Sequence, residues 1–377
     1  MSMLETETAQ MIHPDPIHPK AREMRVIDTD FHFTPEFASI QNFLTEPFKT
    51  KVKGYPLSGA DYDARYAISI EDSGLAVQGK AKNPQEILGV LDEIGVDTVI
   101  INPGLRPIAY FNEPVISAIA SAYNDYLIHE VFPASDRLKG NIIINQRDPE
   151  AAAAEIRRVA KHKNFVGVYG EFGATEQIGT SKHDPIFEAL KEFDLVLVMH
   201  ASGFWPQRSP LANGSRTWVE GIGIAWPAFA QAHMGSMIFQ GVFDKYPNQK
   251  VLLQEGGLWW VIDFMLRMDE FYLDHPGDIQ LVERKLESGE KYLQKMPSDY
   301  VLEHFRFSTQ PISKPKSSKE FKDLLNLCRA EKLFLYSSDW PHATFDPPNW
   351  VVEGSIMSEE MQKRILSENA IELFSRL

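Results

Sequence analysis

The sequence of 377 residues contains 38 basic and 52 acidic residues, which gives a formal net charge of −14. Hydrophobic residues make up 44% and charged residues 24%, ordinary values for a globular chain with a substantial core. This composition excludes a disordered, collagen-like or coiled-coil protein, and the negative charge argues against nucleic acid or an anionic membrane as partners. No apolar run reaches the roughly 18 residues of a membrane span, and the start lacks a signal-peptide core, so we expect a cytoplasmic protein.

Residues 1–24 are polar, and we expect a flexible N-terminal tail followed by a single domain over residues 25–377. Short apolar runs of the kind that strands buried on both faces require then recur along the chain. They lie at 26–31, 97–102, 140–145, 165–170, 195–200, 250–255, 305–309 and 332–338. Segments with helical periodicity alternate with these runs. The sequence therefore predicts a (β/α)₈ TIM barrel, a fold of about 250 residues plus insertions. An open doubly wound sheet is the alternative, but no G-x-G-x-x-G motif follows the first run.

The spacing of the predicted strands is uneven, which predicts loop insertions after strands 1, 5 and 6. These insertions cover about 35–85, 201–231 and 271–303. The second contains Phe204, Trp205 and several glycines, a composition that suggests an aromatic lid or pocket wall. We therefore expect a small, ring-containing or otherwise apolar substrate.

Polar residues stand at the end of every predicted strand, where a barrel of this type carries its chemistry. Asp30 and His32 are two residues apart on the first strand and so share one face. His200 ends an apolar run, where a buried imidazole needs a partner such as a metal ion. Asp339 ends the last strand, which neighbours the first in a closed barrel. Each residue alone also has a structural interpretation, as a loop cap, a core histidine or a turn residue, but together they predict a metal site.

Several segments in the same order resemble the amidohydrolase-related family typified by aminocarboxymuconate-semialdehyde decarboxylase. They are VIDTDFHF, HDPIFEAL, VMHASG, GVFDKYPNQKVLLQEGGLWW, FMLRMDE, YSSDWPH and ENAIELF, and they span residues 26 to 375. The resemblance implies a (β/α)₈ barrel with one divalent metal ion, usually Zn²⁺ or Mn²⁺. It also implies that Asp30, His32, His200 and Asp339 are the ligands.

One position departs from the family pattern. Many members carry a catalytic histidine at the end of strand six, whereas QEGGLWW places Glu255 there. We interpret Glu255 as a catalytic or ligand group of the metal site, with a cap for the helix near Gly257 as the structural alternative. His342 lies in the same motif as Asp339 and is a further candidate catalytic residue, either behind the ligands or facing the substrate.

Three reactions suit such a site. Hydrolysis needs a metal-activated water and a carboxylate base, a role that Asp339 can fill, and it is the expected activity. Non-oxidative decarboxylation of an aromatic or unsaturated carboxylic acid is the alternative, although Glu255 would repel the substrate carboxylate. A second metal bridged by Glu255 would instead suit a dinuclear non-haem iron oxygenase. A metal-free scaffold is the least favoured interpretation.

The substrate is expected to be a small molecule, and a homodimer is compatible with the sequence. Arginines in the loops after strands 2 and 5 could offset the charge of Glu255, and aromatic or amide side chains could contact the substrate. The candidate substrate-binding residues are Asn102, Arg106, Phe204, Trp205, Arg208 and Trp260.

Overall fold

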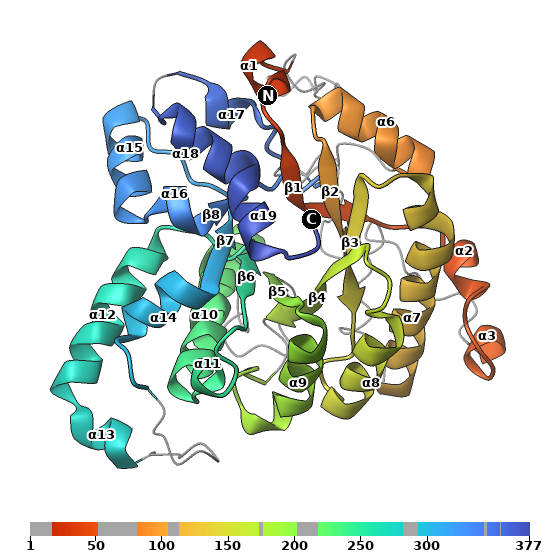
Figure 1. Ribbon diagram of the computed structural model, residues 1–377, viewed down its shortest axis with the longest axis horizontal. Coiled ribbons are helices and arrows are strands. Elements are labelled where there is room, and N and C mark those ends of the chain that lie inside the picture. The colour runs from red at the N-terminus through yellow and green to blue at the C-terminus, as the bar shows by residue number, and fades with distance from the viewer. Residues whose placement is uncertain are drawn as a thin grey trace, which may run out of the picture.

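The computed structural model describes residues 17–51, 81–104, 113–172, 176–201, 218–281, 293–342, 345–354 and 356–377. Its eight strands form one parallel sheet in chain order, which confirms the predicted barrel. The strands are β1 (Ile27–Phe33), β2 (Thr98–Pro103), β3 (Leu138–Ile143), β4 (Phe165–Phe172), β5 (Val196–Ala201), β6 (Val251–Gln254), β7 (Phe305–Ser308) and β8 (Phe334–Leu335). In Figure 1 these strands lie at the centre and the helices surround them.

The helices of the described chain alternate with the strands and continue into the C-terminal segment. They are α1 (Pro19–Arg22), α2 (Phe37–Gln41), α3 (Phe48–Lys51), α6 (Pro84–Ile94), α7 (Glu113–Tyr126), α8 (Pro149–Val159), α9 (Asp184–Phe193), α10 (Trp218–Phe239), α11 (Val242–Lys245), α12 (Trp260–Asp274), α13 (Pro276–Leu281), α14 (Pro297–His304), α15 (Ser318–Leu327), α16 (Ala330–Leu333), α17 (Asn349–Val352), α18 (Glu359–Lys363) and α19 (Asn369–Leu373). Short helical turns lie at Leu127–Val131, Phe132–Ala134, Ser181–His183 and Arg364–Glu368.

Helix α6 shows how local sequence sets the helix bounds. The Asn83 side chain accepts a hydrogen bond from the Glu86 N–H at 3.0 Å, and Pro84 occupies the first turn, where it needs no N–H donor. Gly95 ends the helix in the left-handed region at φ +71°, a conformation that glycine adopts without a Cβ penalty. Asn83 and Gly95 thus fix both ends of the helix before β2.

The core has two parts, one on each side of the sheet. Most buried apolar side chains lie between the strands and the surrounding helices. A smaller cluster lies among the strands and includes Ile27, Val198 and Leu252, and α19 adds Ala370 and Leu373 to it. Because these interior residues sit near the strand starts, the polar strand ends are left at the opposite mouth of the barrel.

The first strand contains an irregularity that matters for the site. Its register against β2 shifts between Asp28 and Phe31, which is the signature of a β-bulge. Ile27 and Asp30 are three residues apart and would face opposite sides of a regular strand. The bulge allows Ile27 to join the interior cluster while Asp30 and His32 also point into the barrel.

Two expectations about the loops change. Residues 17–24 were expected in a flexible tail, but they include α1, and Ala21 is fully buried against the core. Within the second predicted insertion, residues 202–217 lie outside the described residues, and α10 begins at Trp218, so its second half is helical. The described parts of the third insertion contain the end of α12, the whole of α13 and most of α14.

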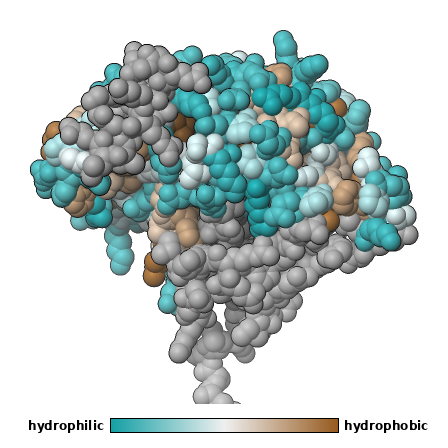
Figure 2. Space-filling model, turned by 90° about the horizontal axis from the view of Figure 1, so that it is seen from below, coloured by the Kyte–Doolittle hydropathy of each residue, from teal (hydrophilic) through white to brown (hydrophobic). Residues whose placement is uncertain are grey.

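On the face shown in Figure 2, the described residues are largely hydrophilic, with apolar side chains scattered among them. The most exposed large apolar residues include Leu266 and Leu273 on α12. Among the described residues, no helix has the length and apolarity needed to cross a membrane.

Candidate metal centre

Six potential ligand side chains meet at the mouth of the barrel, and we call them the ligand cluster. Two come from β1, one from β5, one follows β6 and two follow β8. They are Asp30, His32, His200, Glu255, Asp339 and His342. The first five are 4% exposed or less, whereas the His342 side chain is 30% exposed. All the ligands that the sequence predicted therefore lie together, with His342 between them and the solvent.

The imidazole of His32 lies at the middle of the cluster. Its Nε2 atom is 3.2 Å from Asp30 Oδ1, 3.2 Å from His200 Nε2 and 3.3 Å from Asp339 Oδ1. The donor atoms of Asp30, His32, His200 and Glu255 lie within 4.8 Å of one another, and so do those of His32, Glu255, Asp339 and His342. Donor atoms this close can converge on one ion, since ligands about 2.1 Å from a metal lie roughly 3 Å apart.

Backbone carbonyls orient both buried imidazoles. His32 Nδ1 faces the Pro103 carbonyl at 3.3 Å, and His200 Nδ1 faces the Ala201 carbonyl at 2.5 Å. Because a carbonyl only accepts, Nδ1 carries a proton on each ring, and Nε2 is the nitrogen that offers a lone pair to the cluster once a cation displaces its proton. A histidine that binds a metal through Nε2 has its Nδ1 held in this way.

Glu255 joins the cluster rather than capping a helix. Its Oε1 atom lies 3.4 Å from His200 Nε2 and 3.9 Å from His32 Nε2. Helix α12 begins at Trp260, and Trp259 is its N-cap. Glu255 has φ +55°, a left-handed conformation that is uncommon for a residue with a side chain and often marks a functional site.

Asp339 joins the first strand of the barrel to the segment that follows the last strand. Its main-chain N–H donates to the Asp30 carbonyl at 2.9 Å, and its Oδ1 atom accepts a hydrogen bond from His342 Nδ1 at 2.5 Å. It also has positive φ, at +57°. The His342 ring lies 4.4 Å from the His32 ring, centroid to centroid.

Opposite charges within the cluster shift the pKa values in a consistent pattern. Burial alone would raise the pKa of Asp30 and Asp339, but the neighbouring imidazoles outweigh it and hold both below their ordinary values. Burial lowers the pKa of His32, yet Asp30 raises it to about 9. For Glu255 burial and the charge of Asp339 raise the pKa. The protons that compensate the carboxylates can be replaced by a divalent cation, as metal binding generally displaces protons.

The cluster fits a single divalent metal ion. Asp30 Oδ2 and Glu255 Oε2 are buried and have no hydrogen-bond partner in the structure. A buried carboxylate oxygen without a partner is costly, and a cation would satisfy it. The mixed oxygen and imidazole donors suit Mn²⁺, Zn²⁺ or Fe²⁺.

An amide network lies directly behind Asp30. Asn102 donates through Nδ2 to Asp30 Oδ1 at 2.7 Å and to Gln254 Oε1 at 2.8 Å. Its Oδ1 atom accepts from Asn141 Nδ2 at 2.7 Å, and Gln254 Nε2 donates to the Thr29 carbonyl at 2.6 Å. Because both ends of its amide are hydrogen-bonded to buried side chains, Asn102 supports the ligand Asp30. It was expected instead to contact the substrate.

Other supporting residues escaped the sequence analysis. Gln254 and Asn141 are buried polar residues inside apolar runs, a signal that could have identified them. Asp28 precedes Asp30 by two residues and accepts hydrogen bonds from the Ser338 N–H and hydroxyl, and burial raises its pKa to about 7. Asn141 and Asp28 are polar residues inside strands, whereas Gln254 is the last residue of β6.

Of the remaining substrate-binding candidates, the structure describes only Trp260. Trp260 donates through Nε1 to the Gly256 carbonyl at 2.7 Å, and its ring packs edge-on against Phe264 and Phe307. This arrangement gives Trp260 a packing role. Arg106, Phe204, Trp205 and Arg208 lie outside the described residues.

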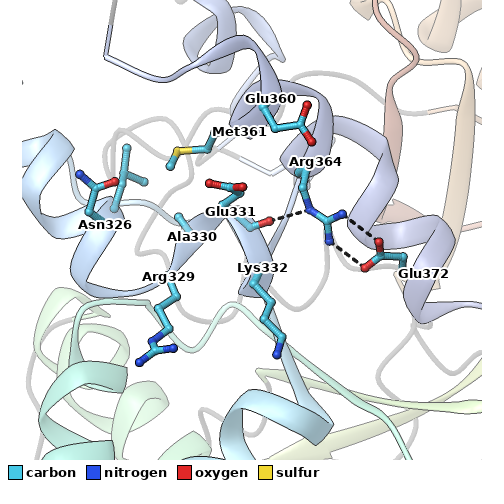
Figure 3. A pocket seen from close by; sticks show the side chains of 10 residues that line it. Asn326, Arg329, Ala330, Glu331, Lys332, Glu360, Met361, Arg364 and Glu372 are labelled. Carbon is cyan, nitrogen blue, oxygen red and sulfur yellow. Dashed lines mark hydrogen bonds and ion pairs between the residues drawn. The ribbon is translucent and has the colours of Figure 1, made fainter.

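A surface hollow of about 570 Å³ lies away from this site, between α15, α16 and α18 (Figure 3). Helix α16 precedes β8, whereas Asp339 follows it, so the hollow is at the other end of that strand. Arg364 crosses one side of it and forms paired hydrogen bonds of 2.8 and 2.7 Å with Glu372. Acidic and basic side chains are mixed around it, and among its lining residues there is no histidine or cysteine.

The fold and the site correspond to a known class of enzyme. The amidohydrolase family model matches residues 27–376, so the chain belongs to this family. The match covers every described strand and all six members of the ligand cluster.

Individual relatives are more distant. The gamma-resorcylate decarboxylase of Polaromonas sp. (strain JS666) is 25% identical over 309 residues, which cover 76% of this chain and 85% of that protein. The protein of the same name from Rhodococcus jostii (strain RHA1) is also 25% identical, over 330 residues, 79% of this chain and 89% of the relative.

A solved structure extends the comparison to three dimensions. The dihydroxybenzoic acid decarboxylase of Polaromonas sp. JS666, with bound manganese and the inhibitor 2-nitroresorcinol, has a TM-score of 0.66 at 20% identity. The match covers 93% of this chain and 97% of that chain. At this identity the likeness shows that the fold is shared.

These comparisons correct the expected reaction. Hydrolysis was the expected activity, but both relatives named above, the solved dihydroxybenzoic acid decarboxylase and a solved 5-carboxyvanillate decarboxylase are named as decarboxylases. The prediction of a hydrolase is therefore wrong, and the decarboxylase alternative is the better supported one. The same ligand set serves both reactions, which is why the ligands alone could not separate them.

Proposed function

We propose that this protein is a metal-dependent, non-oxidative decarboxylase of a small hydroxylated aromatic acid, with Mn²⁺ as its metal. The observation that carries the proposal is the buried ligand cluster at the carboxyl end of the strands, together with relatives that are named as decarboxylases. Mn²⁺ is favoured over Zn²⁺ because the solved dihydroxybenzoic acid decarboxylase holds manganese and because oxygen-rich donor sets suit it.

Four residues would hold the ion: His32 and the three that lie around its Nε2 atom, Asp30, His200 and Asp339, with Glu255 as a further carboxylate beside them. When bound, the ion supplies positive charge that can bind substrate oxygens and stabilise negative charge developing on the ring. The chain's own part is to fix the donors, which the backbone carbonyls behind His32 and His200 and the amide of Asn102 accomplish.

The charge of Glu255 is compatible with decarboxylation. Three carboxylates and one divalent cation leave one net negative charge in a buried site. A substrate carboxylate placed near Glu255 is repelled, and the repulsion falls as that group becomes neutral carbon dioxide. Interactions that disfavour the bound substrate more than the transition state increase the rate. The repulsion that the sequence suggested would oppose decarboxylation thus assists bond cleavage.

His342 is the proposed proton donor. Its Nδ1 atom is held by Asp339, and its side chain is the most exposed of the cluster. As the bond between the ring carbon and the carboxylate breaks, the ring carbon keeps the electron pair and takes a proton from His342. Carbon dioxide leaves, and solvent returns a proton to the imidazole. Such general acid catalysis contributes about 10²–10⁴-fold.

The test is to incubate the manganese-loaded protein with 2,6-dihydroxybenzoate, the acid bound in one solved neighbour, and to measure carbon dioxide and the ring product. In D₂O the product should carry one deuterium at the carbon that lost the carboxylate. Protein stripped of metal by a chelator is the control and should be inactive until Mn²⁺ is restored. If a panel of hydroxybenzoates released no carbon dioxide while the loaded protein hydrolysed esters or lactones, the proposal would be wrong.

A further inference from the structure

The last strand of the barrel meets the first at a boundary that we call the seam. The two segments are joined there mainly by contacts outside the regular hydrogen-bond ladder of the sheet. Strand β8 has only two residues, and beyond it a single bridge pairs Phe31 with Trp340. The His32 N–H donates to the Trp340 carbonyl at 2.8 Å. The ligands of the cluster that come from β1 and from the end of β8 meet across this seam, so their separation depends on contacts beyond the sheet itself.

Thr29 joins the two segments directly, since its N–H and its hydroxyl both donate to the Tyr336 carbonyl, at 3.1 and 2.8 Å. One buried carboxylate adds a second connection. Asp28 Oδ1 accepts hydrogen bonds from the main-chain N–H of Asp30 at 3.0 Å and of Ser338 at 2.9 Å. Its Oδ2 atom accepts from the Ser338 hydroxyl at 2.5 Å. Both residues of the pair are fully buried. Asp28 therefore binds the backbone at one metal ligand and the backbone next to another.

Hydrogen bonds on either side of Asp339 hold this residue in its unusual backbone conformation. Ser338 Oγ accepts the Trp340 N–H at 3.1 Å, and the Asp339 N–H donates to the Asp30 carbonyl at 2.9 Å. Asp339, which lies between Ser338 and Trp340, has φ +57°. A non-glycine residue in this region persists only where its surroundings hold it there.

We propose that Asp28 and Ser338 form a clamp that sets the distance between Asp30 and Asp339 and so determines how tightly the cluster binds its metal ion. Neither residue faces the ion, and both act by positioning the ligands. The inference rests on the proposed metal-dependent function, because it assigns these residues to the affinity of that metal site.

The chemistry of the contact explains the residue types. Three donors converge on the Asp28 side chain, and a carboxylate offers acceptors only. Asparagine could keep Oδ1 for the two N–H groups and donate from Nδ2 to the Ser338 hydroxyl, which has lone pairs to accept it. Alanine at position 28 would leave all three donors without this partner. The two substitutions at one position therefore separate geometry from charge.

The first experiment compares Ser338→Ala with Ser337→Ala. Ser337 is also fully buried and next in sequence, but its hydroxyl accepts the Gln310 N–H at 2.9 Å and so joins the end of β7 instead of β1. The Mn²⁺ dissociation constant is measured from the electron paramagnetic resonance signal of free Mn²⁺, and Tm is measured on the metal-free proteins. We expect both variants to lose Tm, and Ser338→Ala alone to bind Mn²⁺ about 10–100-fold more weakly.

The second experiment uses Asp28→Asn and Asp28→Ala. The asparagine variant should keep Mn²⁺ affinity within about threefold, and the alanine variant should lose about 10–100-fold. The clamp would be overturned if Ser338→Ala bound Mn²⁺ as tightly as wild type does. It would also be overturned if Asp28→Asn and Asp28→Ala lost Mn²⁺ affinity equally. If wild type binds no Mn²⁺, the proposed metal site fails instead. If it binds Mn²⁺ and the clamp variants behave as expected without any decarboxylation, the clamp stands and the proposed reaction fails.

Discussion

Nδ1 of His342 lies 2.5 Å from Oδ1 of Asp339, and this hydrogen bond joins the most exposed side chain of the ligand cluster to a carboxylate that is almost fully buried. Because this bond uses Nδ1, the other ring nitrogen of His342, Nε2, is not bonded to Asp339. An acid or base that must exchange protons with solvent between turnovers needs such a partly exposed position. His342 is therefore placed to transfer protons while the buried members of the cluster bind the metal.

The first prediction concerns His342→Asn. Asparagine can still donate from Nδ2 to Asp339, but it cannot transfer a proton at neutral pH. We expect carbon dioxide release to fall by about 10²–10⁴-fold, with the bound manganese unchanged by elemental analysis. The matched control is His129→Asn, because His129 is exposed, stacks on the Phe43 ring and is not a member of the ligand cluster. A His342→Asn variant within tenfold of wild type would show that another group donates the proton.

The second prediction is that His200→Ala removes most of the bound metal and leaves the fold intact. Nδ1 of His200 is held by the Ala201 carbonyl, so Nε2 has no role except toward the cluster. The measurement is metal content after purification, with circular dichroism to verify folding.

Its control is His304→Ala, which removes an equally buried imidazole. His304 Nδ1 donates to the Gln249 carbonyl at 2.9 Å, and the ring stacks on Phe243 at 4.2 Å. This variant should lose stability through the cavity and the lost hydrogen bond, yet keep its metal. Full metal content in His200→Ala would show that His200 is a core residue and not a ligand.

The strands and the ligand positions could be read from the sequence because both depend on local patterns. Continuous apolar runs predict strands buried on both faces, and every predicted run overlaps a strand of the structure. Histidine and carboxylate residues at the ends of such runs, for example His200, must be compensated in a buried site, so a metal site follows.

Features that depend on contacts between distant segments could not be read in this way. The bulge between Asp28 and Phe31 decides that Ile27 and Asp30 both face the interior, and nothing in a period-2 pattern reveals it. The role of Asn102 depends on Asn141, which is brought beside it by a neighbouring strand. The reaction itself also escaped the sequence reasoning, because hydrolysis and decarboxylation use the same metal ligands.

The third prediction concerns Asn102→Ala. The variant leaves Asp30 Oδ1, Gln254 Oε1 and Asn141 Nδ2 without their amide partner in a buried place. Each buried polar group that loses its partner costs about 1–3 kcal/mol, so the free energy of unfolding should fall by roughly 3 kcal/mol or more. The measurement is denaturant unfolding of the metal-free protein, which keeps metal binding out of the comparison.

Asn83→Ala is the reference for this variant. Asn83 is also hydrogen-bonded, but it caps α6 at the surface, and loss of an N-cap costs about 1 kcal/mol. Equal losses of unfolding free energy in the two variants would mean that solvent or neighbouring side chains replace the Asn102 amide.

The fourth prediction is a dependence of stability on pH that originates in His233. This residue is 2% exposed, and its Nδ1 atom accepts the Ile178 N–H at 3.2 Å. Burial, with a smaller effect from the charge of His183, lowers the pKa of His233 to about 4. Because the folded pKa lies below the unfolded value of about 6.5, the unfolded chain takes up the proton first as the pH falls. The contribution of neutral His233 to the free energy of unfolding is therefore fully present above about pH 6.5 and is lost progressively toward pH 4.

His233→Asn isolates this effect. Asparagine offers an oxygen to the Ile178 N–H but does not titrate, so the part of the pH dependence that comes from His233 disappears. Between pH 7.5 and 4.5 the wild type should lose roughly 2–3 kcal/mol more unfolding free energy than the variant, measured by guanidinium denaturation at both pH values. His162→Asn, at an exposed histidine, should behave as wild type does. If His233→Asn lost as much stability as wild type over this range, proton uptake at another buried group, not at His233, would drive acid unfolding.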